Sequence, residues 1–366
     1  MFSDTDRQFM AEALDCAAQA RFTARPNPAV GCVLVRDGRV IGRGWTQPVG
    51  GPHAEIEALR DAGDAGGATA YVTLEPCAHH GRTGPCADAL AAAGVTRVVA
   101  AIEDPDPRVD GGGVARLRNA GITVEVGLLA EAAQQQLAGF LLRMRRGWGR
   151  VRLKVAASLD GRTAMASGES QWITGVEARA DVQRLRAESC AILTGVGTVL
   201  ADDCRLTVRA DQLPCTGSLA QRALAVPPLR VVLDSDARAP AVAAIFAGDA
   251  PSAQLVADDL IDPPARGIPI ARGQAGGLDL VAVMAWLGEQ QCNDILVEAG
   301  PTLAGALLDA QLVDELIWYA APKFLGRSAR PFASFERERL ADAITLRFHE
   351  FTPLGDDLRI IATPES

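Results

Sequence analysis

The sequence is poor in lysine, tyrosine and long apolar runs. Of 366 residues, two are lysine and two are tyrosine, and arginine carries nearly all the positive charge. No run approaches the 18 or so apolar residues of a transmembrane helix, and residues 1–7 lack the basic-then-apolar order of a signal peptide. The eight cysteines are too sparse for a disulfide framework, so we expect core thiols or metal ligands in a reducing compartment. These absences predict a cytoplasmic protein that does not contact a membrane.

Length and charge indicate two domains and exclude a nucleic-acid binder. A chain of 366 residues exceeds one ordinary domain, and 48% hydrophobic with 22% charged residues is typical of globular proteins. The net charge is −9. The first 146 residues hold 15 basic and 17 acidic residues, for a net charge of −2, and the remainder has −7. Neither half therefore offers a basic track for phosphates.

Hydrophobic periodicity predicts an α/β sandwich in the first half. Apolar residues at helical spacing predict a helix over 6–21. Strands over 30–35 and 39–44 flank Asp37-Gly38, which is typical of a two-residue hairpin. Helices and strands then alternate. We predict helices over 54–62, 85–93 and 113–120, and strands over 70–73, 97–101 and 123–126.

The alternation stops at Gly147-Trp148-Gly149, which predicts a boundary between domains 1–146 and 147–366. No internal repeat links the halves, so we expect two different chemistries. We predict helices over 177–187, 279–290 and 302–310, strands over 151–156, 190–194, 229–233, 294–298, 313–319 and 345–351, and surface connections at 210–228 and 262–269.

The strongest chemical signal is a set of potential zinc ligands, His53, Cys77 and Cys86. One imidazole and two thiolates leave the fourth position of a tetrahedral zinc for water, as in catalytic sites. Zinc would lower the pKa of that water from about 16 toward about 7. Glu55 follows His53 by two residues at a helix start, so it can take the water's proton without being a ligand. Cys86 lies in the first turn of a predicted helix, where the helix dipole favours the thiolate.

Two other interpretations of these cysteines stay open. Residues 78–85 separate the cysteines, whereas the general signature of zinc-dependent base deaminases is His-x-Glu with Pro-Cys-x-x-Cys. A structural site would need a fourth ligand, which His79 or His80 could supply. Alternatively, both thiols are plain core residues. The carboxylate of Glu55 favours a catalytic site, in which the inserted residues would line the substrate pocket.

The order of the motifs resembles a known family. The motifs are Pro26-Asn27-Pro28, Val30-Gly31-Cys32, His53-Ala54-Glu55, Thr73-Leu74-Glu75-Pro76-Cys77, His79-His80-Gly81-Arg82-Thr83 and Pro85-Cys86. They resemble the deaminase half of the bifunctional riboflavin-biosynthesis deaminase/reductase, in which the widened cysteine spacing is a family feature.

That resemblance implies a cytidine-deaminase-like three-layer fold with one zinc bound by His53, Cys77 and Cys86. It implies that Glu55 passes a proton to the leaving amine. The implied reaction converts 2,5-diamino-6-(5-phosphoribosylamino)pyrimidin-4-one to 5-amino-6-(5-phosphoribosylamino)uracil. Asn27 either holds the pyrimidine or is a turn residue between two prolines.

The second half contains no G-x-G-x-x-G fingerprint, but it has a possible phosphate site. Gly195-Val196-Gly197 supplies two of the three glycines and is a weak match. The segment 295–306 is a better candidate because an apolar strand runs into a glycine turn and a helix with proline at its first position. The same pattern also fits a packed strand-to-helix turn without a ligand.

Three segments of this half, 154–162, 167–174 and 193–203, resemble the reductase half of the same family. The resemblance extends over about residues 6–360. It implies a dihydrofolate-reductase-like α/β domain that uses NADPH to convert the ribosyl group to ribityl. The implied cofactor contacts are Ala156, Trp172, Thr198, Asp202, Ser235, Gly300, Pro301, Thr302, Leu303, Ala304, Gly305 and Ala306. The implied substrate contacts are Ser170, Arg186, Leu206, Arg209 and Glu298.

Several of these assignments have alternatives. A guanidinium fork at Arg186 or Arg209 suits the substrate's phosphate, but either residue could be a solvated surface charge. Asp202 is the first candidate for a general acid, or it caps a turn together with Asp203. Cys204 stands where the family more often has proline. The resemblance also implies a homo-oligomer that binds a small-molecule substrate and no nucleic acid or membrane.

Two competing functions remain at this point. The zinc ligands would also suit a nucleoside or nucleic-acid deaminase, although the charge of −2 disfavours a polynucleotide substrate. A metal-stabilised scaffold without catalysis is the other, and it leaves Glu55 without a role.

Overall fold

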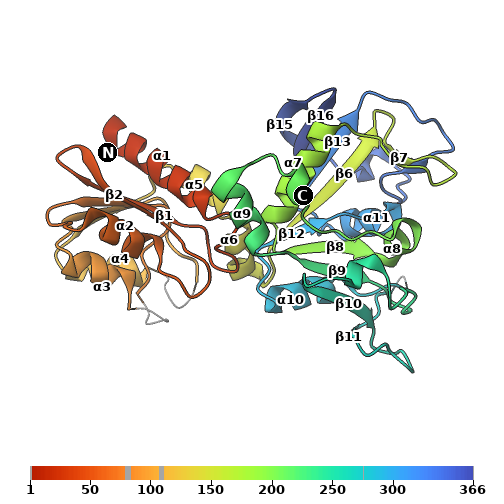
Figure 1. Ribbon diagram of the computed structural model, residues 1–366, viewed down its shortest axis with the longest axis horizontal. Helices are drawn as coiled ribbons and strands as arrows, with labels where there is room; N and C mark the ends of the chain where they lie inside the picture. The colour runs from red at the N-terminus through yellow and green to blue at the C-terminus, as the bar shows by residue number, and fades with distance from the viewer. Residues whose placement is uncertain (1, 79–83, 107–110, 275, 366) are drawn as a thin grey trace. The chain divides into compact units, whose positions relative to one another are not determined.

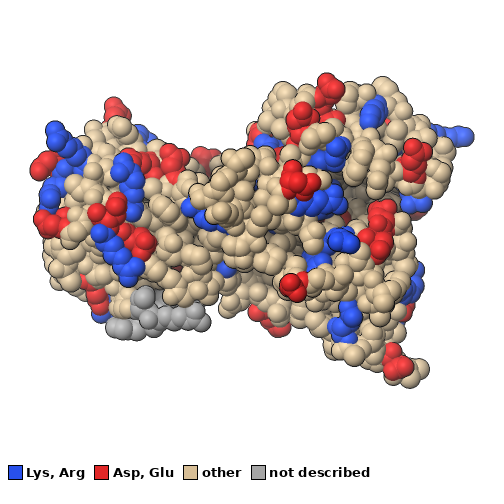
Figure 2. All heavy atoms as spheres, in the orientation of Figure 1, with Lys and Arg blue, Asp and Glu red and all other residues tan. Residues whose placement is uncertain are grey.

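The computed structural model describes residues 2–78, 84–106, 111–274 and 276–365. The chain divides into two compact units, Met1–Arg146 and Gly147–Ser366. Acidic and basic side chains are interspersed on the face of each unit that Figure 2 shows. Within the described ranges, no helix is long and apolar enough to cross a membrane.

Unit 1 is built on a five-stranded sheet with the order β2-β1-β3-β4-β5 (Figure 1). Strand β1 runs antiparallel to both of its neighbours, whereas β3, β4 and β5 are parallel. The start of β1 therefore lies at the same edge as the carboxyl ends of β3 and β4. The strands are β1 (Gly31–Arg36), β2 (Arg39–Trp45), β3 (Thr69–Val72), β4 (Arg97–Ala100) and β5 (Thr123–Val126).

Two glycines show that helices cover both faces of this sheet. A Cβ at Gly31 would lie 1.9 Å from the carbonyl oxygen of Ala13 in α1 (Asp4–Gln19). A Cβ at Gly44 would lie 2.1 Å from the carbonyl oxygen of Ala54 in α2 (Ala54–Ala62). Gly44 pairs with Cys32, the neighbour of Gly31, so the two helices cover opposite faces. The sheet is thus the middle of three layers, as the resemblance implied.

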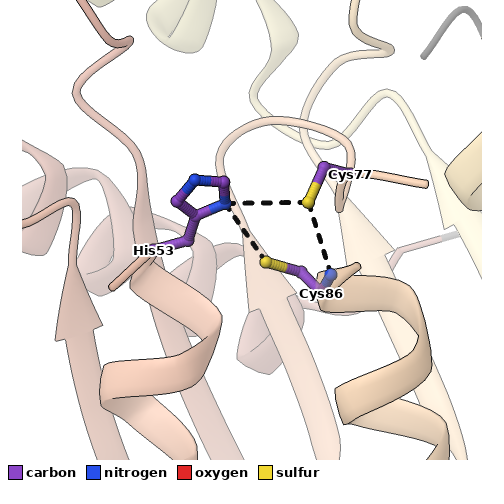
Figure 3. Close-up of side chains that lie close together, drawn as sticks. All are labelled: His53, Cys77 and Cys86. Carbon is purple, nitrogen blue, oxygen red and sulfur yellow. Dashed lines mark hydrogen bonds between the residues drawn. The ribbon is translucent and has the colours of Figure 1, made fainter. Parts of the chain in front are cut away.

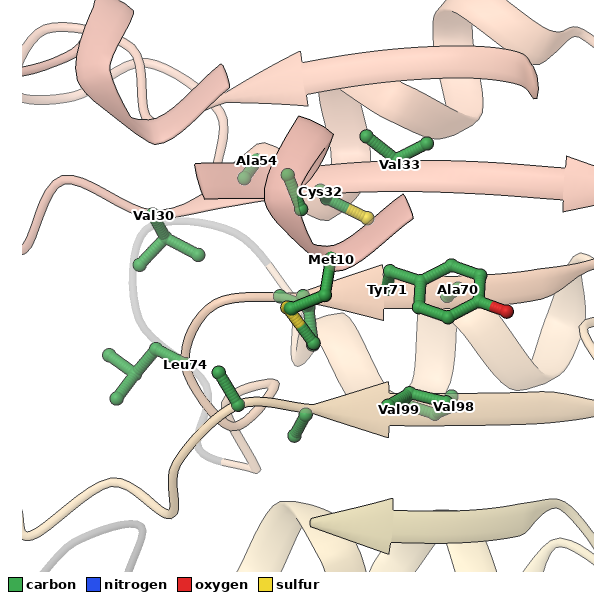
Figure 4. Packing of buried hydrophobic residues seen from close by; sticks show 14 of the residues in the cluster. Met10, Val30, Cys32, Val33, Ala54, Ala70, Tyr71, Leu74, Val98 and Val99 are labelled. Atoms are coloured by element: carbon green, nitrogen blue, oxygen red, sulfur yellow. The ribbon is translucent and has the colours of Figure 1, made fainter. Parts of the chain in front are cut away.

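The remaining helices of unit 1 complete the two outer layers. Figure 1 shows α3 (Cys86–Ala92) and α4 (Gly112–Asn119) beside α2, and α5 (Ala130–Gln136) beside α1. Helix α6 (Ala138–Arg146) ends the unit. Strand alternation places Val33, Tyr71 and Val99 on the face of α1, where Met10 packs over them (Figure 4). This core fixes the edge of the sheet on which the chemical residues lie.

Unit 2 contains a nine-stranded sheet with the order β11-β10-β9-β8-β12-β6-β13-β16-β15. Every pair from β11 to β13 is parallel, and β16 and β15 are antiparallel. Strands β7 (Arg162–Ala164) and β14 (Arg330–Pro331) pair separately. The large sheet comprises β6 (Arg150–Ser158), β8 (Ala191–Gly195), β9 (Leu229–Leu233), β10 (Ser252–Ala257), β11 (Gly267–Ile270), β12 (Asp294–Val297), β13 (Glu315–Ala321), β15 (Leu346–Leu354) and β16 (Asp357–Pro364).

Two helices of this unit begin where central strands end. Helix α8 (Val196–Asp202) follows β8 directly, and α11 (Pro301–Asp309) follows β12 after three residues. Apolar side chains on the two faces of the sheet form separate clusters, one beneath α10 and α11 and the other beneath α7. The other helices are α7 (Val176–Glu188), α9 (Gly217–Ala225) and α10 (Leu280–Glu289).

Two predicted connections were wrong in part. Residues 210–228 contain α9, a nine-residue helix that begins at Gly217 and has one buried residue, Ala223. Residues 262–269 include the start of β11, an edge strand that tolerates Pro269 because it has a strand on one side only. Helices α5, α6 and α8 and strands β10 and β16 were not predicted either.

Candidate zinc and cofactor sites

The three potential zinc ligands converge from separate elements at one edge of the sheet in unit 1 (Figure 3). His53 is the N-cap of α2, Cys86 is the first residue of α3, and Cys77 lies in the loop after β3. The Nδ1 atom of His53 lies 3.6 Å from the Sγ of Cys77 and 3.3 Å from the Sγ of Cys86. All three ligand atoms lie within 4.8 Å of one another.

These distances fit a tetrahedral zinc. Zn–S bonds of about 2.3 Å and Zn–N bonds of about 2.0 Å at tetrahedral angles place the ligand atoms roughly 3.5 Å apart. The two measured N–S distances bracket that value. One imidazole and two thiols are also one of the donor sets that hold a catalytic zinc with an open fourth position.

The protein prepares one of the two thiols as a thiolate. The Cys86 thiol and its backbone N–H donate hydrogen bonds to the Cys77 sulfur and lower the pKa of Cys77 to about 4, although burial opposes this. The N–H bond is 3.3 Å long. The pKa of Cys86 is raised by its bond to Cys77 and by burial. The hydrogen bonds that converge on Cys77 therefore favour the thiolate form of this residue.

Glu55 has the protonation properties of a proton shuttle. Its side chain lies in the first turn of α2, two residues after His53, and the residue is 4% exposed. Burial, followed by the negative charge of Cys77, raises the pKa of Glu55 from 4.5 to about 7. A carboxyl group with this pKa can take up and release a proton at neutral pH.

The implied cofactor residues of unit 2 gather at the carboxyl edge of its parallel strands. Ala156 is in β6, Thr198 is in α8, Ser235 follows β9 and Gly300 follows β12. A Cβ at Gly300 would lie 3.8 Å from the Oγ1 of Thr198, so the starts of α8 and α11 are neighbours. Parallel α/β sheets bind ligands at this edge, and two adjacent helix N-termini offer free N–H groups to a pyrophosphate.

Only part of the segment 300–306 faces that edge. Pro301 has no N–H, so Thr302 and Leu303 supply the free N–H groups of the first turn of α11. Ala304 is buried, and its N–H bonds to the carbonyl oxygen of Gly300. A Cβ at Gly305 would lie 2.1 Å from the carbonyl oxygen of Ser334. Gly305 therefore serves helix packing in this structure, and the exposed Ala306 lies beyond the first turn.

Glu298 is the centre of a buried charge cluster beside the same turn. Arg186 binds both carboxylate oxygens of Glu298, at 2.6 and 3.0 Å, and Lys154 binds one at 3.1 Å. Burial opposes ionisation, but the two cations lower the pKa of Glu298 to about 2. The bidentate edge of Arg186, expected to grip a phosphate, is thus occupied by Glu298. Lys154, to which no sequence motif gives a role, completes the cluster.

Comparisons with known proteins decide the family. The family model of the RibD C-terminal domain matches residues 150–360, and that of the cytidine and deoxycytidylate deaminase zinc-binding region matches residues 3–102. The riboflavin biosynthesis protein RibD of Escherichia coli (strain K12) is 53% identical over 358 residues, which cover 96% of this chain and 98% of that protein. The chain belongs to the RibD family.

Solved structures of RibD proteins agree with this assignment. RibD of Acinetobacter baumannii (form 1) superposes with a TM-score of 0.90 at 43% identity and covers 99% of both chains. A deaminase/reductase of Thermotoga maritima gives a TM-score of 0.86 at 30% identity, covering 98% of this chain and 99% of that one. The predicted fold classes, a cytidine-deaminase-like domain and a dihydrofolate-reductase-like domain, are confirmed. The chain is a RibD-type deaminase and reductase, a family that requires zinc and a nicotinamide cofactor.

The other cofactor and substrate residues implied by the resemblance lie in α8 and in the segments 165–175 and 203–209. Ser170 is half-buried, and Trp172 is 58% exposed with the guanidinium of Arg179 4.5 Å from its ring centre. Leu206 is buried with a φ of +50°, and Arg209 is exposed. Asp202 is exposed at the end of α8.

The two residues that follow Asp202, Asp203 and Cys204, each have a local environment that the structure defines. Asp203 ends α8 and accepts a hydrogen bond from the backbone N–H of Ala244, which gives it a loop-fixing role. Cys204 is half-buried in the same loop, and burial raises the pKa of its thiol to about 11.

Glu75, two residues before Cys77, belongs to one of the motifs that carry the resemblance, but no role of its own was predicted for it. The buried carboxylate of Glu75 accepts backbone N–H groups of Asp104, Gly111 and Val114 at 2.9–3.1 Å. It therefore ties the loop that bears Cys77 to the start of α4. An acidic residue directly after an apolar strand was the available signal.

Two predictions about the deaminase pocket have different outcomes. Asn27 is half-buried in the loop before β1, at the zinc-bearing edge of the sheet. His79 and His80, and with them the alternative fourth ligand, lie outside the described residues.

Proposed function

We propose that unit 1 deaminates 2,5-diamino-6-(5-phosphoribosylamino)pyrimidin-4-one and that unit 2 reduces the resulting 5-amino-6-(5-phosphoribosylamino)uracil at its ribosyl group. The observation that carries the proposal is the triangle of His53, Cys77 and Cys86 with the buried carboxyl group of Glu55 beside it. RibD proteins that match over nearly the whole chain support both substrates.

In the deamination, Glu55 moves the protons. Zinc, when bound, supplies the Lewis acidity that makes a water molecule nucleophilic at neutral pH. Glu55 accepts a proton from the attacking water and donates it to the departing amino group, so the C–N bond breaks and ammonia leaves. The pKa of about 7 suits both halves of this transfer.

In the reduction, the protein orients two ligands at one sheet edge. NADPH, when bound, supplies a hydride to C1 of the ribose, the ring C–O bond breaks, and the ring oxygen takes up a proton. The N–H groups of Thr302 and Leu303 suit the pyrophosphate of the cofactor. Nε and Nη2 of Arg186 donate to Glu298 and its Nη1 donates to the carbonyl oxygen of Thr207, so the exposed Arg209 is the better candidate for the substrate phosphate.

The proposal includes the finer properties implied by the family. Each chain binds one zinc and uses NADPH in preference to NADH. The protein acts in the cytoplasm as a homo-oligomer on a small molecule, and neither nucleic acid nor membrane takes part. The small number of cysteines in a chain of this length suits a reducing compartment.

A single assay tests both activities. Zinc-loaded protein is incubated with the diaminopyrimidine substrate while ammonia and NADPH absorbance are followed together. Ammonia release followed by NADPH consumption is the expected result. Ammonia without NADPH consumption would leave the deaminase and remove the reductase assignment, and the absence of both would overturn the proposal.

A further inference from the structure

Both lysines of the chain belong to unit 2, one within a strand and one just beyond the end of its neighbour. Lys154 is in β6, and Lys323 follows the neighbouring parallel strand β13 by two residues. Elsewhere in the chain, arginine supplies the side-chain cations. At Lys323 this uncommon choice places a compact ammonium group, rather than a planar guanidinium, beside the segment between β7 and α7.

The ammonium group of Lys323 binds two successive backbone carbonyls. Its Nζ donates to the carbonyl oxygen of Trp172 at 2.9 Å and to that of Ile173 at 2.7 Å. The next carbonyl, that of Thr174, accepts a hydrogen bond of 2.7 Å from Arg179. Three consecutive carbonyls in the segment between β7 and α7 are thus held by two cations.

Lys323 itself is held from the other side. Its carbonyl oxygen accepts a hydrogen bond of 3.0 Å from the backbone N–H of Leu159. Asp160 accepts N–H groups of Leu325 at 3.1 Å and Gly326 at 2.8 Å. The turn after β6 therefore fixes the segment that carries the lysine, and Lys323 transmits this position to Trp172.

The held segment bears groups that the proposed reductase uses. Ser170 and Trp172 are implied substrate and cofactor contacts, and the Trp172 ring is 58% exposed with Arg179 stacked on it. An exposed indole that contacts a ligand benefits from a fixed backbone. If the backbone were mobile, it would have to become ordered on binding, and that entropy cost would lower the affinity for the ligand.

We infer that Lys323 is a positioning residue of the reductase, which fixes the backbone of Trp172 and Ile173 so that the Trp172 side chain is in place for the bound ligands. This inference rests on the proposed function of unit 2. Because Lys323 is exposed, its bonds contribute little to global stability. Its effect belongs to local order and ligand binding.

The test compares K323M, K323R and the control R327M in the full chain. Arg327 is an exposed cation four residues further along, and no hydrogen bond of its side chain is seen among the described residues. For K323M we expect backbone amides of residues 172–175 to exchange about tenfold faster, with Tm within about 2 °C of the wild type. The KM values for NADPH and 5-amino-6-(5-phosphoribosylamino)uracil should rise about tenfold, more than kcat falls, while ammonia release is unchanged.

Results for K323M and for the control R327M can overturn the inference. Unchanged exchange in K323M would show that the lysine does not fix the segment, and this readout needs no enzyme activity. Faster exchange with unchanged KM would separate the segment from the reductase. Wild-type exchange and kinetics in K323R would support the inference, because a guanidinium can also donate to both carbonyls. Effects in R327M equal to those in K323M would overturn it, because they would point to surface charge. If the wild type consumes no NADPH, the proposed function of unit 2 fails. The exchange data would still test whether Lys323 fixes the backbone of Trp172 and Ile173.

Discussion

Two buried glutamates, one in each unit, have opposite protonation properties. Glu55 is 4% exposed beside the thiolate of Cys77, and its pKa rises to about 7. Glu298 is 8% exposed between Arg186 and Lys154, and its pKa falls to about 2. The same side chain thus becomes a proton carrier in one environment and a permanent anion in the other. Burial raises the pKa of both carboxyl groups, and the two cations beside Glu298 reverse that effect in unit 2.

The largest expected effect is the loss of a zinc ligand in unit 1. Replacing Cys77 with alanine removes one of the three zinc ligands, so the protein should lose its zinc and all measurable deamination. Unit 2 has its own core, and NADPH oxidation with supplied aminouracil should continue. Metal analysis with both assays measures this. Cys16→Ala, a buried cysteine outside the triangle, is the control. Retained zinc in the Cys77 variant would contradict the ligand assignment.

Glu55→Gln should separate proton transfer from metal binding. The amide keeps the shape of the side chain but cannot accept a proton, so deamination should slow by about 10²–10⁴-fold. Zinc content and the reductase rate should equal those of the wild type. The steady-state rate of ammonia release checks this, and full activity in this variant would remove Glu55 from the mechanism.

Glu298→Gln should destabilise unit 2 and leave unit 1 intact. The change leaves two buried cations without their anion, which costs about 3 kcal/mol in the free energy of unfolding. Denaturation followed separately by loss of deaminase and of reductase activity measures this. Asp309→Asn, which removes an exposed partner of Arg337, should change stability by less than about 0.5 kcal/mol. Equal effects of the two changes would contradict the cluster's role.

A pair of glycine substitutions should affect one unit each. A Cβ at Gly113 would lie 1.8 Å from the carbonyl oxygen of Pro76, next to Cys77, and one at Gly305 would lie 2.1 Å from that of Ser334. Each alanine variant should lose about 1–3 kcal/mol of stability. Gly113→Ala should impair zinc retention, and Gly305→Ala the reductase. Gly197→Ala, where a Cβ meets no described atom within 4 Å, is the control.

The last prediction concerns the pH dependence of the stability that the ionised Glu298 contributes. Its folded pKa of about 2 lies below the ordinary value of 4.5, so its contribution to stability is complete above about 4.5 and is lost as the pH falls toward 2. Unfolding curves of wild type and Glu298→Gln should therefore differ above pH 4.5 and converge below it. A constant difference down to pH 2 would show that the charge of Glu298 does not stabilise the fold.

The difference between the units also explains what the sequence could predict. Histidine and cysteine are uncommon residues and typical zinc ligands, and His53, Cys77 and Cys86 lie in short motifs. The residues by themselves therefore predict the zinc site. The cofactor edge consists of backbone N–H groups and small residues such as Thr302, which give a weaker signal. The residues of segment 295–306 predicted a phosphate site but also fitted a packed turn without a ligand. The family resemblance assigned Gly305 to the cofactor, whereas the backbone of Ser334 explains the glycine by packing.

Element prediction failed where the pattern is short or flat. Helix α8 has seven residues including Gly197, and the nine-residue α9 begins at Gly217, so both are shorter than the helices that periodicity identifies best. The cluster of Glu298, Arg186 and Lys154 joins residues up to 144 positions apart, and no local pattern predicts such a contact.

Two self-contained cores in a single polypeptide also have a consequence for metabolic flux. Translation produces one deaminase site for every reductase site, so their molar ratio is fixed at synthesis and gene expression cannot adjust it. Any balance between the two steps must then come from the turnover rates of the sites themselves. A substitution that slows one unit changes the steady-state level of the aminouracil intermediate, with no compensating change in the number of the other sites.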